Sequence, residues 1–336
     1  MTTKTKLSRR SFVAGSAGVF LVPRFAKAEA EFVMKVASVA PSGTPWAKHL
    51  RALKKRIQTE SGGRIKVKAY LGGALGDEIA TAEATKRGAI QVFGGTAAAL
   101  ASAVPELAVV ELPFLFDRVS QADHVLDNVI RADLEKLLWD RGYVLGFYSE
   151  NGWRSIGTNF GPVHGPKDLA GKKMRSMESD VHLATWRALG ASPVPIPVTE
   201  VLSALQTGVV DGFDNTPLFT FAASWYQGIN NFTLTRHSYQ PGLVVFSRKW
   251  WEKLPQDLQE IVRGDPVAES KKGRRGVRAI RKMLIQNFTN AGIAVYEPTA
   301  SERSAMKGAT AKVHDEFARK TGAAGKRLLD KIRKAL

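Results

Sequence analysis

Two arginines in short extended segments are the residues of this chain whose possible chemistry is clearest. Arg154 lies in NGWRSIGTN, and Arg175 lies between two methionines in KKMRSM. A guanidinium presents a planar fork of donors that matches both oxygens of a carboxylate, which a lysine ammonium cannot reproduce. An arginine on a surface strand can instead lay its stem along apolar neighbours and keep its head in water. We expect Arg175 to face an anion.

Patterns typical of catalysis or metal binding are absent from the sequence. The segment GGALGDE has neither the GxGxxG spacing nor the GK[ST] ending of a phosphate loop, and there is no G-x-S-x-G. Cysteine is absent, which excludes disulfides and thiolate ligands. The six histidines have no metal-ligand spacing, and we expect them at the surface or as caps: His49, His124, His164, His182, His237 and His314. The sequence therefore predicts no metal, no cofactor and no catalytic residue.

The charge is strongly positive but unevenly distributed. The 336 residues carry a formal charge of +18, and six of these charges lie within residues 1–28, which contain no acid. The densest basic run, residues 271–282, spreads its charges around a helical wheel rather than along one stripe. A solvated helix explains this run, and no aromatic-interleaved basic surface is present, so no nucleic-acid partner is expected.

Residues 1–28 have the layout of a bacterial export signal. Arg9 and Arg10 precede an apolar run of about eleven residues, and small residues follow at Ala26 and Ala28. The apolar run is shorter than the roughly twenty residues that span a bilayer. We expect a twin-arginine-type signal, cleaved after Ala28, and a mature protein in the periplasm.

The remaining chain predicts alternating strands and helices. Strands are expected at 32–40, 64–71 and 90–93, with helices at 46–60 and 78–89 between them. This β-α-β-α-β order favours a largely parallel sheet. Further on we expect two strands at 143–149 and 153–159, another at 173–177, helices at 179–190 and 198–208, and one long helix from about 255 to 290.

These elements predict an α/β protein of two lobes with a ligand cleft between them and the long helix spanning both. Lobe I is expected to contain residues 29–150 plus about 243–272, and lobe II residues 151–242 plus about 273–336. Ligands of such folds bind where the lobes meet, beyond the carboxyl ends of the strands.

Several segments carry a family resemblance. GPKDLAGKKMRSMES, ALGASPVPIPVTEVLSALQTGVVDGFDN and LTRHSYQPGLVVFSRKWWEKLPQDLQE follow one another as in the solute-binding proteins of tripartite ATP-independent periplasmic (TRAP) transporters. LGGALGDEIATAEATKRGAIQVF and PELAVVELPFLFD fit the same pattern, so the resemblance covers nearly the whole mature chain. It implies a two-lobed protein that closes around a small organic acid and delivers it to membrane transporter subunits.

The resemblance also implies roles for particular residues. The arginine that pairs with the ligand carboxylate in this family matches Arg175, a second family arginine matches Arg154, and a family asparagine matches Asn215. Where many members read D-G-Q-E-N-P, this chain has Phe213 and Asp214; these two residues are also candidates for the binding site, and how the rest of the ligand is held stays open.

Other candidates for the cleft wall are Trp46, Glu78, Phe93, Trp153 and Phe219. A chain of this size also needs large apolar side chains in its core, and each aromatic residue could serve there instead.

Arg154 has two possible roles: it could contact the ligand, or it could be structural, either holding a carboxylate such as Asp214 or positioning the Arg175 loop. We also keep two alternatives for the function. One is an exported enzyme acting on organic acids with His182 or Asp214 as base, and the other is a polyanion-binding exported domain.

Overall fold

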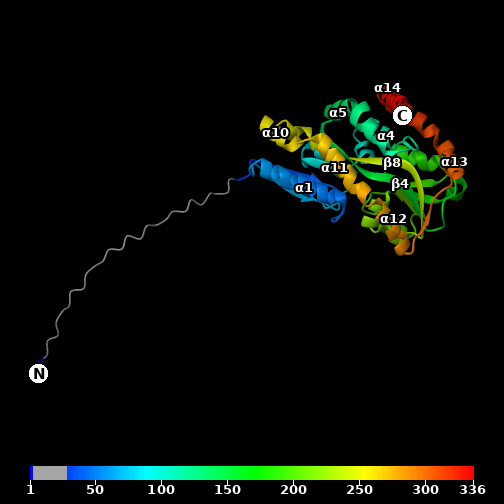
Figure 1. Cartoon of the computed structure of the whole chain (residues 1–336), viewed down its shortest axis with the longest axis horizontal. Coiled ribbons are helices and arrows are strands. Elements are labelled where there is room, and N and C mark those ends of the chain that lie inside the picture. Colours follow the sequence, from blue (N-terminus) through cyan, green and yellow to red (C-terminus); the bar gives the residue numbers. More distant parts are fainter. Residues whose placement is uncertain (3–28) are drawn as a thin grey trace.

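The computed structural model describes residues 1–2 and 29–336, and the expected export signal, apart from its first two residues, lies outside the described residues. Helices cover both faces of a central sheet, and the long strands β4 (Tyr143–Thr158) and β8 (Asn231–Ser247) run through its middle (Figure 1). Among the described residues, no helix has the length and apolar character needed to cross a membrane.

The described sheet contains nine strands in the order β2-β1-β3-β8-β4-β7-β5-β6, and β9 pairs with β8. At one end lie β1, β2 and β3, and at the other end β5, β6 and β7; within each group the pairs are parallel. The shorter strands are β1 (Phe32–Ala37), β2 (Ile65–Tyr70), β3 (Val92–Thr96), β5 (Lys173–Ser176), β6 (Ser192–Pro195), β7 (Gly212–Asn215) and β9 (Ala294–Tyr296).

The two long strands β4 and β8 pair with each other in antiparallel fashion and join the two ends of the sheet. The sheet is therefore mixed, not largely parallel. The two strands expected at 143–149 and 153–159 are one strand, β4, whose register with β8 shifts at three bulges. One bulge includes Gly152, whose φ of 107° suits a residue without a Cβ. The polar segment around this glycine reads as a loop in the sequence, but the backbone stays paired.

The helices are α1 (Pro45–Glu60), α2 (Glu78–Arg87), α3 (Ala97–Leu100), α4 (Val119–His124), α5 (Arg131–Asp140), α6 (Asp180–Ala188), α7 (Val201–Gln206), α8 (Pro217–Ala222), α9 (Arg248–Trp251), α10 (Gln256–Arg263), α11 (Pro266–Ala279), α12 (Arg281–Asn290), α13 (Ala300–Thr310) and α14 (Lys312–Ala335). Short 3₁₀ or π turns lie at Pro105–Glu111, Val125–Val129, Pro166–Leu169 and Trp225–Gly228.

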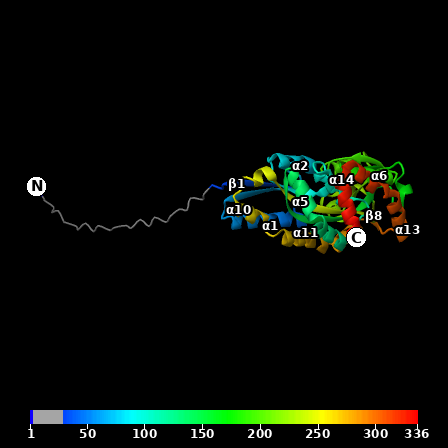
Figure 2. The same cartoon turned by 90° about the horizontal axis from the view of Figure 1, so that it is seen from above.

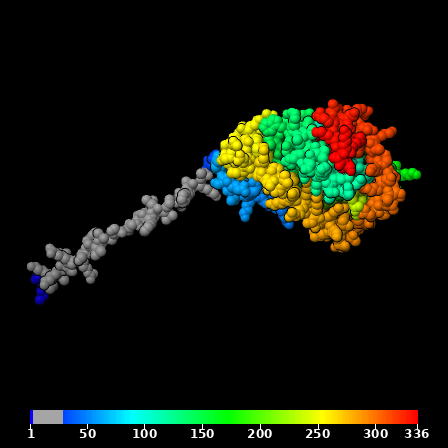
Figure 3. All heavy atoms as spheres, turned by 45° about the horizontal axis from the view of Figure 1, so that its top comes forward, coloured from blue at the N-terminus to red at the C-terminus, as the bar shows by residue number. Residues whose placement is uncertain are grey.

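The single long helix expected from about 255 to 290 consists of α10, α11 and α12. Gly264 leaves the helical conformation at φ 56°, and Pro266 begins α11 after the cap residue Asp265, whose Oδ1 accepts from the Val267 and Ala268 amides. A second irregularity at Ile280 (φ −99°, ψ 0°) separates α11 from α12. These two helices still follow one another across the molecule, as the yellow-to-orange band in Figure 3 shows.

The C-terminal helix α14 packs back onto the first half of the chain. Lys331 Nζ lies 2.7 Å from Asp133 Oδ2 on α5, and Val313 and Leu329 join the same apolar cluster as Leu107. Figure 2 shows α14 (red) near α5, on the far side of α5 from α10. The end of the chain therefore reinforces elements that lie two hundred residues earlier.

Candidate functional site

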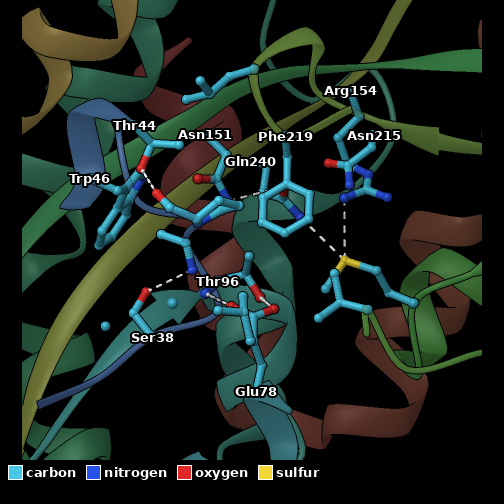
Figure 4. Close-up of a pocket in the computed structure, with 18 of the residues that line it drawn as sticks. Ser38, Thr44, Trp46, Glu78, Thr96, Asn151, Arg154, Asn215, Phe219 and Gln240 are labelled. Carbon is cyan, nitrogen blue, oxygen red and sulfur yellow. Dashed lines mark hydrogen bonds between the residues drawn. The ribbon is translucent and has the colours of Figure 1, made fainter. Parts of the chain in front are cut away.

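A pocket lies where the carboxyl ends of parallel strands from both ends of the sheet approach one another. Its lining residues are Ser38, Val39, Ala40, Pro41, Thr44, Trp46, Glu78, Gly94, Gly95, Thr96, Asn151, Arg154, Arg175, Met177, Val198, Asn215, Leu218, Phe219 and Gln240. In Figure 4, Glu78 and Thr96 lie on one side of this pocket, and Arg154 and Asn215 lie on the other. The position is the one at which α/β folds bind ligands.

Arg175 projects from β5 into this pocket. Because side chains alternate along a strand, its neighbour Met174 faces the apolar core while Arg175 faces the pocket. The Arg175 guanidinium is only 3% exposed, its Nε and Nη2 donate to the Ile196 carbonyl at 2.9 and 2.8 Å, and it lies 5.2 Å from the centre of the Trp225 ring.

Within residues 29–336, no carboxylate lies within 4.0 Å of the Arg175 guanidinium. Burial, together with the nearby Arg154 cation, lowers the pKa of Arg175 to about 10. A buried cation with only a carbonyl as partner favours an anion beside it.

Arg154 differs because its charge is matched inside the protein. Its Nε donates to Asp214 Oδ2 at 2.5 Å, and its Nη2 donates to the Asp214 carbonyl. Its Nη1 points at Met177 Sδ, 3.3 Å away, a contact drawn in Figure 4. Burial alone would raise the pKa of Asp214, but Arg154 and the His237 hydrogen bond hold it well below its usual range. The structural role considered for Arg154 is thus present, although Arg154 also lines the pocket.

Behind Arg154 lies a buried cluster of polar side chains. His237 Nε2 is 3.2 Å from Asp214 Oδ2, and His182 Nε2 is 2.9 Å from Glu111 Oε2. Gln240 links this cluster to the pocket wall, since its Nε2 donates to Glu111 Oε2 at 3.2 Å. Burial lowers the pKa of His237, although the contact with Asp214 opposes this shift. These contacts keep the second arginine and Gln240 in place.

Glu78 lines the pocket from the first turn of α2. The Asp77 carboxylate caps this helix by accepting from the Ile79 and Ala80 amides, which sets the direction of the Glu78 side chain. Glu78 Oε1 accepts from the Thr96 amide at 2.9 Å and Oε2 from the Thr96 hydroxyl at 3.0 Å. Burial raises the pKa of Glu78 to about 7, so this carboxyl can be neutral or charged near neutral pH.

Aromatic and amide groups complete the pocket. The Trp46 indole donates to the Glu150 carbonyl at 3.0 Å and packs over Gly242, where a Cβ would collide with the ring. Phe219 lies 5.5 Å from Trp225, ring centre to ring centre. Asn215 Oδ1 accepts from the Thr216 amide at 2.7 Å, which leaves its amide nitrogen to donate elsewhere.

Six of the ten residues expected at a binding site meet in this pocket: Arg175, Arg154, Asn215, Glu78, Trp46 and Phe219. The other four do not line it. Phe93 and Trp153 point to the opposite side of their strands from the pocket-lining Gly94 and Arg154, because side chains alternate. Phe213 is fully buried against Trp225, and Asp214 lies behind Arg154 as its ion-pair partner.

The sequence interpretation missed several pocket residues that come from other elements. Asn151 and Gln240 face one another across β4 and β8, with Asn151 Nδ2 donating to Gln240 Oε1 at 3.3 Å. Ser38 and Thr44 follow β1, and Thr96 ends β3. A glutamine directly before the apolar run PGLVVF is the signal that could have indicated Gln240.

The expectation for the histidines is wrong at three positions. His49, His182 and His237 are at most 7% exposed, and each lies beside a carboxylate: Glu269, Glu111 and Asp214, respectively. These carboxylates pair with the histidines in the interior, a constraint that scattered sequence positions do not reveal. In the part of the chain that the structure describes, no group of three or more His, Asp or Glu side chains is arranged so that it could hold a metal ion.

A mixed α/β sheet with a cation-lined pocket between its two ends defines a two-lobed ligand-binding protein. The sequence model of the DctP family, described as bacterial extracellular solute-binding protein, family 7, matches residues 36–321. A solute-binding protein of Verminephrobacter eiseniae is 30% identical over 281 residues, which cover 84% of this chain and 82% of the relative. The C4-dicarboxylate-binding periplasmic protein DctP of Rhodobacter capsulatus is 29% identical over 298 residues, 87% of this chain and 88% of the relative.

Solved structures agree with these matches. A TRAP periplasmic solute-binding protein from Sulfitobacter with bound β-D-galacturonate superimposes with a TM-score of 0.86 at 25% identity, covering 90% of this chain and 99% of that one. The sugar acid binding protein DctPAm from Advenella mimigardefordensis, in complex with galactonate, gives a TM-score of 0.85 at 28% identity. The match covers 90% of this chain and 98% of that one. This chain belongs to the family 7 bacterial extracellular solute-binding proteins. The family resemblance and the two-lobed α/β fold expected from the sequence are thereby confirmed.

Proposed function

We propose that this protein binds a small organic acid in the periplasm, with the ligand carboxylate paired to Arg175, and passes it to the membrane subunits of a TRAP transporter. The observation that carries the proposal is the buried Arg175 guanidinium in the pocket, next to Arg154 and without a carboxylate partner among the described residues. Relatives and structural neighbours described with C4-dicarboxylates, galacturonate and galactonate support an acid as ligand.

The ligand carboxylate would complete the charge balance of the pocket. Arg154 is already matched by Asp214, so one unmatched positive charge remains at Arg175. The planar fork of Arg175 offers its Nη1 edge, because Nε and Nη2 already donate to Ile196. The free amide donors of Asn215 would bind the same carboxylate.

The other side of the pocket would recognise the body of the ligand. Ser38, Thr44, Glu78 and Asn151 present hydroxyl, carboxyl and amide groups, and Trp46 and Phe219 present flat apolar faces. Because these groups come from both ends of the sheet, the ligand would bind the closed arrangement of the lobes better than the open one and would shift the population toward closure.

A panel of acids with neutral counterparts tests this function. We would measure thermal stability and calorimetric binding with galactonate, galacturonate and succinate, and with galactitol as the neutral counterpart of galactonate. At a hundred times its dissociation constant, a ligand adds about 2.7 kcal/mol of stability. We expect at least one acid to bind at micromolar concentration and galactitol not to bind. Equal binding of galactonate and galactitol would contradict the role of the charge.

We further propose that the protein performs no chemistry on its ligand. The two bases considered for an enzyme, His182 and Asp214, are 3% and 1% exposed and do not line the pocket. Prolonged incubation with a bound acid should return it unchanged by NMR. A time-dependent product that vanishes in His182→Gln would favour the enzyme instead.

For localisation, we propose export by the twin-arginine signal at residues 1–28 and removal of this segment. Replacing both Arg9 and Arg10 by lysine should leave the full-length precursor in the cytoplasm of a bacterial host, whereas the parent chain appears shortened in the periplasmic fraction. Processing that is unaffected by the double replacement would indicate a general secretory signal.

A further inference from the structure

A second hollow, which shares Asn151 and Leu218 with the wall of the first pocket, collects arginines that the proposed function does not use. Two cavities share Val119, Trp153, Arg236 and Arg281 in their walls. We call these two together the arginine-lined hollow. One cavity, of about 250 Å³, is lined by apolar side chains that include Leu234, Val277, Leu284 and Ile285. The other is open and adds Asp117, Arg118 and Arg303.

The hollow is built by elements distant in sequence. Trp153 belongs to β4 and points away from the pocket because its neighbour Arg154 points into it. Arg236 comes from β8, Arg303 from α13 and Arg281 from the first position of α12, just after the irregularity at Ile280. The positions of α11 and α12 along this side of the molecule can be followed in Figure 3.

The charges in the hollow are incompletely matched. Glu297 pairs with Arg236 at 2.5 Å, and Asp123 and Glu150 pair with Arg278 at 2.7 and 2.6 Å. By contrast, no carboxylate within residues 29–336 lies within 4.0 Å of the guanidinium of Arg118, Arg281 or Arg303. Asp117 is the acidic residue among the lining residues of the open cavity.

The pKa values of two of these arginines, Arg281 and Arg303, are lowered in these surroundings. Burial lowers the pKa of Arg281, and the Arg236 cation lowers it further. The pKa of Arg303 is also lowered by burial, although Asp117 opposes the shift. Arg303 is held in place by the carbonyls of Thr235 and Arg236 and by the Phe114 ring, 4.9 Å away. An anion in the hollow would relieve this repulsion without moving the arginines.

We propose that the arginine-lined hollow is a second binding site, which takes a small organic anion with an apolar or aromatic body. The anionic group would pair with Arg281 and Arg303, whose charges are unmatched. The apolar body would cover Trp153 and enter the cavity beside Leu234 and Leu284. The hollow combines an apolar wall with a cationic rim. It therefore favours an amphipathic anion over an inorganic one, because the apolar body of such a ligand contacts the wall while its charged group pairs with the arginines. This proposal does not depend on which acid occupies the first pocket.

The test uses the mature protein carrying Arg175→Ala, so that the first pocket no longer competes. We would titrate 1-naphthoate by calorimetry at physiological salt, and in parallel 1-naphthalenemethanol and sulfate. We expect 1-naphthoate to bind with one-to-one stoichiometry and at least tenfold more tightly than either comparison compound. Trp153→Phe should remove the accompanying change in tryptophan fluorescence. Failure of 1-naphthoate to bind, or equal binding of either comparison compound, would overturn the proposal.

Charge-reversal variants distinguish specific binding in the hollow from non-specific attraction of an anion to a basic protein. Arg281→Glu should weaken 1-naphthoate at least tenfold, and Arg275→Glu is the matched control, since this exposed arginine lies on α11 outside the hollow. Equal weakening by the two variants would overturn the site. If Arg281→Glu lowers the melting temperature, Arg118→Glu provides the same test, because Arg118 lines the same open cavity and also has no carboxylate partner among the described residues, and it must also weaken binding.

Discussion

Arg154 and Asp214 form an ion pair in the interior of the protein, with 2.5 Å between Nε and Oδ2 and both side chains 1% exposed. The pair gives the two arginines that line one pocket different surroundings. The Arg154 charge is balanced by Asp214, whereas no carboxylate among the described residues lies within 4.0 Å of the Arg175 guanidinium. Asp214, in the segment DGFDNTP, is therefore the internal partner of Arg154.

Breaking this buried pair should be costly. In Asp214→Asn the Arg154 guanidinium remains buried without its counter-charge, and such losses amount to about 3–5 kcal/mol of unfolding free energy. Urea unfolding of the empty protein at pH 7 measures the change. Asp140→Asn is the control, because its pair with Lys136 is on the surface and contributes no more than about 1 kcal/mol. A loss at Asp214 no larger than at Asp140 would show that the pair is unimportant for stability.

Arg175→Ala should separate binding from stability. We expect the affinity for the bound acid to fall by about 100-fold or more, because the ligand carboxylate loses a charged, hydrogen-bonded partner. The melting temperature of the empty protein should change by only a few degrees, since relief of a buried charge offsets the lost contacts with Ile196 and Trp225. Calorimetry and thermal unfolding measure the two quantities.

Two further variants complete the Arg175 experiment. Arg175→Lys keeps the charge but not the planar fork, and its affinity should lie between those of the parent and the alanine variant. Arg187→Ala, an exposed arginine on α6, should bind like the parent. Parent-like affinity in Arg175→Ala would refute the proposed pairing.

Glu78 should make stability depend on pH. Its pKa is raised from 4.5 to about 7, so the folded state binds a proton more tightly than the unfolded state. The stability contributed by the neutral carboxyl is fully present below pH 4.5 and is lost as pH rises to about 7, a change of about 3 kcal/mol. Glu78→Gln stays neutral and should not show this loss.

The measurement for Glu78 is the difference in unfolding free energy between pH 4.5 and pH 8. The parent should lose about 3 kcal/mol more than Glu78→Gln over this interval. Glu83→Gln, on the same helix, should follow the parent. Parallel curves for the parent and Glu78→Gln would mean that Glu78 titrates normally.

Two glycine substitutions should have opposite effects. In Gly242→Ala the new methyl group would collide with the Trp46 ring in the pocket wall, so we expect a loss of about 1–3 kcal/mol and at least tenfold weaker binding. Gly308→Ala, within α13, meets no atom within 4 Å and should stabilise the protein by up to about 1 kcal/mol. Thermal unfolding and calorimetry check both, and unchanged binding in Gly242→Ala would show that the Trp46 position is not needed.

Local sequence patterns were sufficient to predict many helices and strands of the fold. The apolar spacing of Leu50, Leu53 and Ile57 predicts α1, and the alternation in IKVKAY predicts β2. Local patterns failed where long-range pairing decides. The segment around Gly152 stays in a strand because β8 pairs along it, and the helix expected from 255 to 290 is divided by Gly264, Pro266 and Ile280.

The binding site likewise has features that local sequence predicts and features that only long-range packing decides. The sequence by itself determined the family and two arginine positions, because an arginine in an extended segment and the motif ALQTGVVDG are local features. Only the tertiary structure decided which arginine is already paired, that Phe93 and Trp153 face away from the pocket, and that Gln240 and Asn151 lie in its wall. The physical reason is that charge balance and burial depend on residues sixty or more positions apart, whose distances are set by how β4, β7 and β8 pair.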